Sequence, residues 1–470
     1  MSPPVQDLLR RIPSVDALLQ DDSLTVCIAG VPHKIVVQSL RAAVEEIRAA
    51  IMAGSADAAE DSAVRGAILA RAKQEIRTAM GPHYRRVINA TGIVLHTALG
   101  RAALPALAVR QIAEELSGYS LLQAEVGSGR RDLRDARIEW ILRQLTGAEA
   151  ATMVNNNAAA TWIVLNAVAA GREVIVSRGQ LVEIGGSFRL PDVMAASGAR
   201  MVEVGTTNKT HARDYQRAIT ENTAAILRVH PSNYKITGFT SEVPLDELVA
   251  IAHARGLVLI DDVGAGALVD LSPIGLDVGP MLRSSLEAGA DLVTSSTDKL
   301  IGASQGGIIL GRAGLVESVR KSPLARIVRP GKLTLAALEA TLMLFFDEAR
   351  ALEEVPTLRM LCRGVGDIGV QAERIAAALG RARPDAAVAV VEGSSQMGGG
   401  SLPGQDLPTR LVAVRGSAIG PDELAARLRR QSPPVFTRIG KDQVLLDPRT
   451  LLEGDEPPLI EAVAAALGDR

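Results

Sequence analysis

Short apolar runs alternate with amphipathic stretches through the middle of the chain, from about residue 150 to 311. The runs are rich in β-branched residues and end in polar or turn-forming residues, a pattern typical of buried strands. Strands that alternate with helices favour a mostly parallel sheet, so the pattern predicts an α/β fold. The predicted strands are 151–154, 173–177, 200–204, 224–230, 257–262, 291–296 and 306–311, with helices such as 157–169 between many of them.

The two ends of the chain have different patterns. Residues 39–52 and about 62–79 each predict an amphipathic helix, with a linker at 54–61 between them. After Lys332 the chain is more helical, and we predict short strands at about 409–414 and 442–446, beyond a Gly/Ser/Pro-rich stretch at 393–404. The predicted parts are a helical N-terminal domain (1–85), a large domain (86–335) and a small C-terminal domain (336–470).

Polar clusters stand at the carboxyl ends of five of the seven predicted strands. Ligands of parallel sheets bind at the carboxyl ends of the strands, so we expect a site where these residues meet. The clusters are Asn155 to Asn157, Ser177 to Gly179, His230 to Asn233, Asp261 with Asp262, and Ser296 to Lys299.

Two of these clusters carry the chemistry of a pyridoxal phosphate site. Asp262 would keep the pyridine nitrogen protonated, and Lys299 would form the Schiff base that makes the cofactor an electron sink. Ser296 would bond the cofactor phosphate. The alternative is that Lys299 is an ordinary solvated lysine after a strand.

A strand that turns directly into a helix at Asn157 and Ala158 predicts a second phosphate contact. Free backbone N–H groups and the positive end of the helix dipole attract an anion, and small residues allow it to approach closely. Asn233, after another strand, is a candidate ligand of the cofactor's 3′ oxygen. The alternatives are an Asn N-cap and an Asx turn that serve only the local backbone.

Composition and charge limit the classes of ligand and partner that the chain can be expected to bind. The chain has 470 residues, 47% of them hydrophobic and 22% charged, as in a soluble globular enzyme. A formal net charge of −2 provides no general attraction for nucleic acid, so any RNA contact must be local. The two cysteines, Cys27 and Cys362, exclude a cysteine zinc site, and we predict no metal. No leader or membrane-spanning apolar run is found, so we expect a cytoplasmic protein.

The N-terminal helical region is nearly neutral, with eleven Lys/Arg against ten Asp/Glu over residues 1–87. A neutral helical domain is most simply a packing or oligomerisation module. If this one binds RNA, it must do so by shape and a few placed contacts.

Several long blocks resemble bacterial selenocysteine synthase, L-seryl-tRNA(Sec) selenium transferase. The resemblance covers nearly the whole chain and includes Arg-Ile-Pro-Ser-Val-Asp near the start and Leu-Thr-Leu-Ala-Ala-Leu-Glu-Ala later on. The blocks with the most specific patterns are Arg-Val-Ile-Asn-Ala-Thr-Gly-Ile-Val-Leu-His-Thr-Ala-Leu-Gly-Arg (86–101), the block from Ser177 to Met194, Glu-Val-Gly-Thr-Thr-Asn-Lys-Thr-His (203–211) and Val-His-Pro-Ser-Asn-Tyr (229–234).

The resemblance implies a fold-type I pyridoxal phosphate enzyme with Lys299 as the cofactor lysine. It implies that seryl-tRNA(Sec) loses water to give dehydroalanyl-tRNA, to which selenium from selenophosphate is added. Arg101, Arg326 and Arg329 would bind the phosphate-like group of selenophosphate, for which planar guanidinium donors are well suited. The N-terminal helices would contact the tRNA, and the chain would assemble into a homo-oligomer, a decameric ring of dimers.

Five positions near the expected pocket depart from the family pattern, and two other functions stay open, the first of them favoured by these departures. One is a related pyridoxal phosphate lyase or transferase that acts on a small amino acid or sugar acid without tRNA. The other is a tRNA-binding protein without enzymatic activity. The departures are Ala98, Gln180, Ala265, Ala303 and Ser304.

Overall fold

The computed structural model describes residues 5–53, 61–186, 188–399, 401 and 404–468. Two compact units make up the chain, Met1–Arg86 and Val87–Arg470. Within these residues, none of the helices has the length and apolar character needed to span a membrane.

The first unit is helical in its described residues. The two predicted amphipathic helices pack against each other and bury a small core that includes Leu40 and Ile68. The predicted linker falls largely on residues 54–60, which lie outside the described residues. The helices are α1 (Val5–Arg10), α2 (Val15–Leu19), α3 (Asp22–Ile28), α4 (His33–Met52) and α5 (Asp61–Met80).

All seven predicted strands form in the second unit, within two residues of their predicted bounds, and they build one sheet. Only β11 runs antiparallel to its neighbours β3 and β10, which confirms the mostly parallel α/β fold. In sheet order the strands are β3 (Ala150–Val154), β11 (Gly307–Gly311), β10 (Leu292–Ser296), β9 (Val258–Gly264), β8 (Thr223–Val229), β4 (Glu173–Ser177) and β7 (Arg200–Val204).

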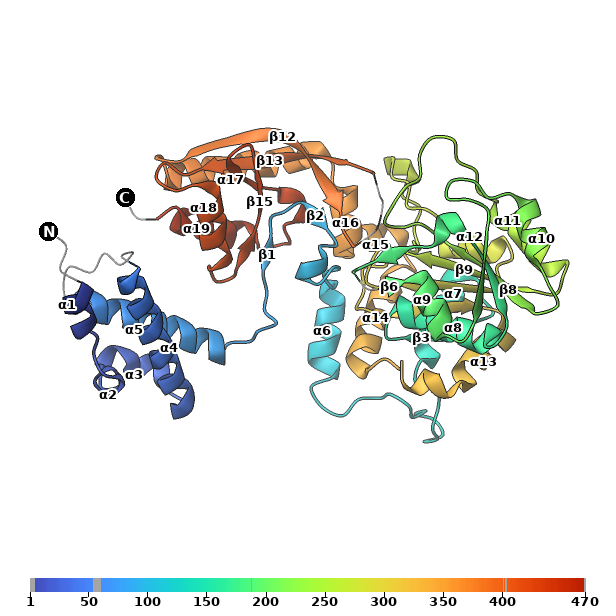
Figure 1. The fold of residues 1–470 in the computed structure, drawn as a ribbon, viewed down its shortest axis with the longest axis horizontal. Coiled ribbons are helices and arrows are strands. Elements are labelled where there is room, and N and C mark those ends of the chain that lie inside the picture. The colour runs from blue at the N-terminus through green and yellow to red at the C-terminus, as the bar shows by residue number, and fades with distance from the viewer. Residues whose placement is uncertain (1–4, 54–60, 187, 400, 402–403, 469–470) are drawn as a thin grey trace. The chain divides into compact units, whose positions relative to one another are not determined.

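Helices cover both faces of this sheet (Figure 1). Neighbouring strand residues such as Leu259 and Ile260 belong to different cores, as expected for alternating side chains in a sheet buried on both sides. One face packs on α8 (Asn157–Ala169), α9 (Leu190–Ala196) and α13 (Ala313–Lys321). The other packs on α7 (Ala136–Thr146), α10 (Ala212–Ala218), α11 (Leu245–His253), α12 (Leu282–Glu287) and α14 (Lys332–Leu344).

A second sheet lies in the C-terminal part of the same unit. Its longest strand, β12 (Ala387–Met397), runs into the stretch predicted as a Gly/Ser/Pro-rich loop, because Gly393 packs closely under Leu411 of the next strand. In order, this sheet contains β15 (Arg438–Gly440), β16 (Gln443–Leu446), β13 (Leu407–Arg415), β12 and β2 (Ile93–Val94). Its core packs on α17 (Val365–Ala382), α18 (Pro421–Arg429) and α19 (Glu456–Ala466).

The segment that follows the first unit joins the C-terminal sheet before it reaches the large one. β1 (Ile88–Asn89) pairs with β14 (Val435–Phe436), and β2 pairs with the end of β12. The remaining elements are α6 (Ala106–Glu115), the short pair β5 (Glu183–Ile184) and β6 (Phe188–Arg189), α15 (Glu348–Glu354), α16 (Pro356–Cys362), and the 3₁₀ turns Thr97–Leu99, Arg178–Gln180, Ser272–Ile274, Pro323–Arg326 and Pro448–Thr450.

Candidate functional site

A cavity of about 280 Å³ lies at the carboxyl ends of the central strands of the large sheet. Six of the residues predicted for the site line it, from four separate segments of the chain. They are Arg101, Asn157, Ala158, Asp262, Ser296 and Lys299. Their meeting point follows from the topology, because parallel strands bring their carboxyl ends to one edge of the sheet.

Asp262 faces this cavity and Asp261 does not. Asp261 is buried and accepts two hydrogen bonds from one nitrogen of Arg228, at 3.0 and 3.2 Å. Asp262 accepts hydrogen bonds from three neutral donors, the Asn157 amide at 2.9 Å and the hydroxyls of Thr161 and Thr294 at 3.0 and 3.1 Å. Burial raises its pKa, an effect that these hydrogen bonds oppose.

No ion pair of Asp262 is found among the described residues. A buried carboxylate without a cationic partner is costly, and a cation beside it would offset that cost. The protonated nitrogen of a pyridine ring is such a cation, so the carboxylate fits the cofactor predicted from the sequence.

Lys299 is buried at the start of the turn after β10. Burial lowers the pKa of its amine, and the charge of Arg101 lowers it further, while Asp298 and Asp262 oppose the shift. Arg101 donates a hydrogen bond of 2.7 Å from Nη1 to Oδ2 of Asp298. A buried amine with a lowered pKa is available as a nucleophile and base closer to neutral pH than an exposed lysine.

The turn from β3 into α8 lines the same cavity as Lys299. Asn156 caps α8 by accepting a hydrogen bond from the Ala159 backbone at 2.9 Å, so the local role considered for a capping Asn belongs to this residue. Asn157 and Ala158 begin the helix, and their N–H groups have no partner within it. Both residues line the cavity, which suits the binding of a phosphate at the helix N-terminus.

His230 also lines the cavity, and the sequence patterns assigned it no role. Its backbone N–H donates to the carbonyl of Asp262 at 2.9 Å, and burial, with the charge of Arg228, lowers the pKa of its ring. Gly279 lies against the ring, since a Cβ there would stand 2.6 Å from Nε2. The signal in the sequence was its place at a strand end, in a polar cluster of which only Asn233 was singled out.

Asn233 does not line the cavity in the described structure. Its amide nitrogen donates to the carbonyl of Glu183 at 2.8 Å, next to Ile184 and Gly185, which do line it. In this structure Asn233 supports the wall of the cavity, and its contact with a cofactor stays a prediction.

Arg326 and Arg329 also lie away from Lys299. Both side chains are exposed and line a separate cavity of about 260 Å³ together with Arg134 and Arg320. Burial lowers the pKa of Arg134, and the charges of Arg329, Arg131 and Arg326 lower it further. One chain therefore does not bring the three arginines of the predicted selenophosphate site into one cavity.

The five departures from the family pattern lie outside the residues that line the Lys299 cavity. Gln180 is buried and accepts a hydrogen bond from the Val229 backbone at 3.1 Å, which its amide oxygen does without adding a charge. Ser304 donates to the Thr334 carbonyl at 3.0 Å. Ala265 and Ala303 are buried in the core, and Ala98 is exposed.

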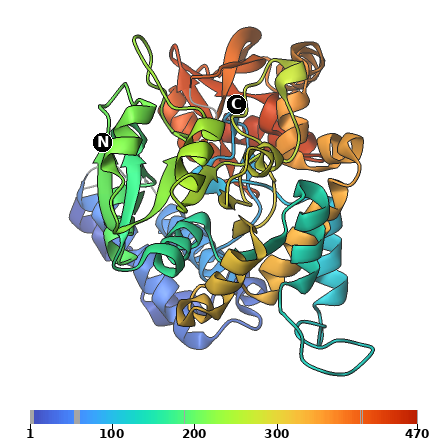
Figure 2. The same ribbon diagram turned by 90° about the vertical axis from the view of Figure 1, so that its right-hand side faces the viewer.

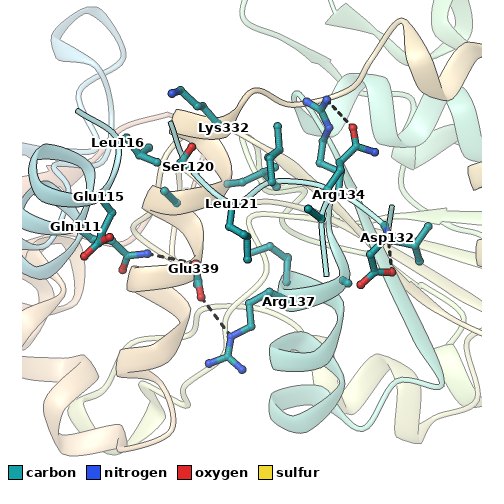
Figure 3. A pocket seen from close by; sticks show the side chains of 18 of the residues that line it. Gln111, Glu115, Leu116, Ser120, Leu121, Asp132, Arg134, Arg137, Lys332 and Glu339 are labelled. Atoms are coloured by element: carbon teal, nitrogen blue, oxygen red, sulfur yellow. Dashed lines mark hydrogen bonds and ion pairs between the residues drawn. The ribbon is translucent and has the colours of Figure 1, made fainter. Parts of the chain in front are cut away.

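A larger cavity, of about 540 Å³, lies between α6, α14 and the segment 117–134 (Figure 3). Its central carboxylate, Glu339, is bonded to Gln111 and Arg137, both at 3.2 Å. The lysine that lines the cavity, Lys332, begins α14 and does not follow a strand, and none of the predicted cofactor residues is among its lining residues. The Lys299 cavity is therefore the candidate site.

Comparison with known proteins gives the family. The profile described as "L-seryl-tRNA selenium transferase" matches residues 87–452, and the profile "Selenocysteine synthase N terminal" matches residues 9–48. The chain belongs to the L-seryl-tRNA selenium transferase family. Its relatives include the L-seryl-tRNA(Sec) selenium transferases of Geobacter sulfurreducens, 45% identical over 97% of this chain and 98% of the relative, and of Nitratidesulfovibrio vulgaris, 45% identical over 98% and 99%.

A solved structure described as D-glucosaminate-6-phosphate ammonia-lyase shares the fold of this family member. It superposes with a TM-score of 0.57 over 84% of this chain and 99% of its own, at 22% sequence identity. At that identity the likeness concerns the fold alone, and it agrees with the α/β architecture predicted from the sequence.

Proposed function

We propose that this member of the family converts L-seryl-tRNA(Sec) to L-selenocysteinyl-tRNA(Sec), with pyridoxal 5′-phosphate as cofactor and selenophosphate as selenium donor. One observation carries the proposal. Lys299, Asp262 and the N-terminus of α8 meet in one cavity, in a chain that the family profile matches over residues 87–452. The two relatives are named for this activity, and the similarity to them covers nearly their whole length.

The cofactor, when bound, supplies an electron sink for the carbanion formed at the α-carbon of the seryl group. Lys299 would anchor it and then, as the free amine, take the α-proton; its lowered pKa favours the unprotonated form that this step requires. Asp262 would stabilise the positive charge on the ring nitrogen. Asn157, Ala158 and Ser296 would hold the cofactor phosphate. His230 would form the wall of the cavity beside the pyridine ring.

Loss of the α-proton and the serine hydroxyl as water would leave dehydroalanyl-tRNA. The selenium of selenophosphate would then add to the β-carbon while the α-carbon takes up a proton, and cleavage of the selenium–phosphorus bond by water would release phosphate. Arg101 is the predicted donor-binding arginine that lines the Lys299 cavity, and its bond to Asp298 directs it there. A guanidinium suits the phosphate-like group of selenophosphate because it offers a fork of donors whose charge does not titrate near neutral pH.

We further propose that the chain acts as a homo-oligomer. The segment 117–134 projects from the body of the second unit (Figure 2) and exposes Tyr119, Leu121 and Val126. Exposed apolar side chains grouped on one segment indicate an interaction surface. A second copy that placed its Arg326 and Arg329 against the Lys299 cavity would complete the predicted set of three arginines.

The described residues of the first unit would provide the tRNA contact outside the catalytic cavity. The family profile for the N-terminal region matches residues 9–48, within this unit. Because the unit is nearly neutral, recognition there would rest on shape and a few placed contacts. We expect the protein to work in the cytoplasm, where aminoacylated tRNA is available.

The direct test is incubation of the full chain with seryl-tRNA(Sec) and selenophosphate, followed by identification of the amino acid on the tRNA. Selenocysteine on the tRNA is the expected result. Recovery of serine alone, with bound cofactor verified by its absorbance, would refute the proposal. Turnover of a small amino acid or sugar acid under those conditions would favour the related lyase or transferase. A chain that binds tRNA without any cofactor absorbance would be the non-enzymatic binding protein.

A further inference from the structure

The segment 88–101, here called the entry segment, leads from the C-terminal sheet to the catalytic cavity. It begins with β1 and β2, both paired with strands of the C-terminal part, and ends at Arg101, which lines the cavity. Two of its non-glycine residues have positive φ, Leu95 at 58° and Arg101 at 62°. Such conformations cost free energy and persist only where the surrounding structure holds them.

A buried polar cluster holds the start of this segment. We define it as Ser395, Thr409, Asp447, Arg449 and Thr450, all at most 3% exposed. Asp447 accepts hydrogen bonds from the Ser395 hydroxyl at 2.7 Å, the Thr409 hydroxyl at 2.9 Å and the Arg449 backbone at 3.0 Å. The Arg449 side chain donates to the carbonyls of Met360 at 2.8 Å and Pro408 at 2.6 Å.

The cluster contacts the entry segment directly. The Thr450 hydroxyl accepts from the Gly92 backbone at 3.0 Å and donates to the Asn89 carbonyl at 2.7 Å, so it closes both ends of one turn. The backbone N–H of Asp447 donates to the Ala90 carbonyl at 2.9 Å. Gly92 has a φ of +71°, and a Cβ there would lie 1.9 Å from Oδ2 of Asp447.

The path from this turn to Arg101 is short, and backbone hydrogen bonds hold it at several points. The Gly92 and Val94 carbonyls accept from the backbones of Gln396 at 2.9 Å and Gly398 at 2.6 Å. The backbone N–H of Arg101 then donates to the His96 carbonyl at 3.0 Å. A displacement of the turn at Gly92 would therefore move the strand that leads to Arg101.

We propose that the buried cluster, through the Thr450 hydroxyl, positions Arg101 for the donor anion, so that Thr450 is a positioning residue of the reaction. The proposal rests on the proposed function, in which Arg101 binds the phosphate-like group of selenophosphate. Thr450 lies in the 3₁₀ turn Pro448–Thr450 and does not line the catalytic cavity. Its effect would reach the donor and leave the cofactor anchors, which come from the large sheet, in place.

The test compares Thr450→Val with Thr341→Val, the same substitution at a buried threonine of α14 whose hydroxyl donates to the Ala337 carbonyl of its own helix, at 2.8 Å. Both are made in the full-length holoenzyme. We expect Thr450→Val to raise the KM for selenophosphate about tenfold, which corresponds to about 1.4 kcal/mol. The KM for seryl-tRNA(Sec) and the bound cofactor should stay unchanged, Thr341→Val should alter neither KM, and Thr450→Ser, which keeps the hydroxyl, should restore the wild-type value.

A double mutant separates positioning from general loosening. In an Arg101→Ala background, Thr450→Val should raise the KM for selenophosphate no further, because the group through which it acts is gone. Additive effects of the two substitutions would overturn the proposal. So would an equal rise of KM in the Thr341→Val control.

The dissociation constant of inorganic phosphate from the holoenzyme, measured by calorimetry, provides a readout that does not depend on turnover. If seryl-tRNA(Sec) is not converted at all, the proposed function fails, and phosphate binding still tests the positioning. The positioning role is supported if Thr450→Val binds phosphate more weakly than wild type and Thr450→Ser binds it as wild type does. In an Arg101→Ala background, Thr450→Val should cause no further weakening. Equal phosphate binding in wild type, Thr450→Val and Arg101→Ala overturns the positioning role.

Discussion

Substituting the two adjacent aspartates one at a time should cause different losses. Asp261→Asn should lose stability, and Asp262→Asn should lose catalytic rate. Asp261→Asn removes the charge partner of the partly buried Arg228, and breaking such a pair costs about 3 kcal/mol of unfolding free energy. Asp262→Asn removes a carboxylate that has only neutral hydrogen-bond donors, so the fold should lose little. If Asp262 stabilises the ring nitrogen, losing that charge should cost about 2 to 4 kcal/mol in the chemical step, or roughly 30- to 1,000-fold in kcat.

The stability difference between Asp262→Asn and wild type should also depend on pH, in a direction that follows from the pKa of Asp262. Burial raises the pKa of Asp262 in the folded apoenzyme, so its stabilising contribution is fully present below its unfolded pKa, near 3.8, and is lost as the pH rises through the folded pKa. Asp262→Asn does not titrate. The unfolding midpoint of this variant should therefore rise relative to wild-type apoenzyme as the pH is raised from 4 to 7.

The assay pairs denaturant unfolding of the apoenzymes with single-turnover kinetics of the holoenzymes. We expect Asp261→Asn to lose stability with a nearly normal rate for the molecules that remain folded. We expect Asp262→Asn to keep its stability and lose its rate. A rate loss confined to Asp261→Asn, or a loss of several kcal/mol of stability in Asp262→Asn, would refute the assignment of Asp262 to the cofactor.

Three other changes test the rest of the site. Lys299→Ala should abolish turnover and the absorbance of lysine-linked cofactor while the fold, followed by circular dichroism, remains; retained absorbance would mean that another lysine is the anchor. Deletion of residues 1–85 should preserve cofactor binding and abolish reaction with seryl-tRNA(Sec) at a fixed salt concentration, with the oligomeric state checked; equal tRNA affinity with and without them would contradict that role. Gly279→Ala should weaken cofactor binding about tenfold, a loss of about 1.4 kcal/mol, because its Cβ meets the His230 ring. Gly275→Ala, also at positive φ but with open space, should lose only stability, so equal cofactor affinity in the two would argue against a role for His230.

The local sequence pattern was sufficient to predict most of the strands and helix bounds of the large domain. Each strand of the large sheet is a short apolar run, and α8 begins and ends at the predicted residues, because periodicity and capping act over a few neighbouring residues. The carboxyl ends of parallel strands meet at one edge, so the approach of Asp262, Ser296 and Lys299 could be expected as soon as the sheet was predicted.

Contacts between distant segments decided the rest. The pattern singled out Asp262, but the role of Asp261 depended on its pairing with Arg228 of the neighbouring strand β8, and the place of His230 depended on Gly279 lying against it. The strand character of 393–397 came from its pairing with β13 and β2, which overrode a glycine- and serine-rich composition. The separation of Arg326 and Arg329 from Arg101, and the cluster around Asp447, involve residues up to several hundred positions apart. A local sequence pattern cannot predict which distant residues come together, because this is decided only when the two sheets form and the segments between them pack.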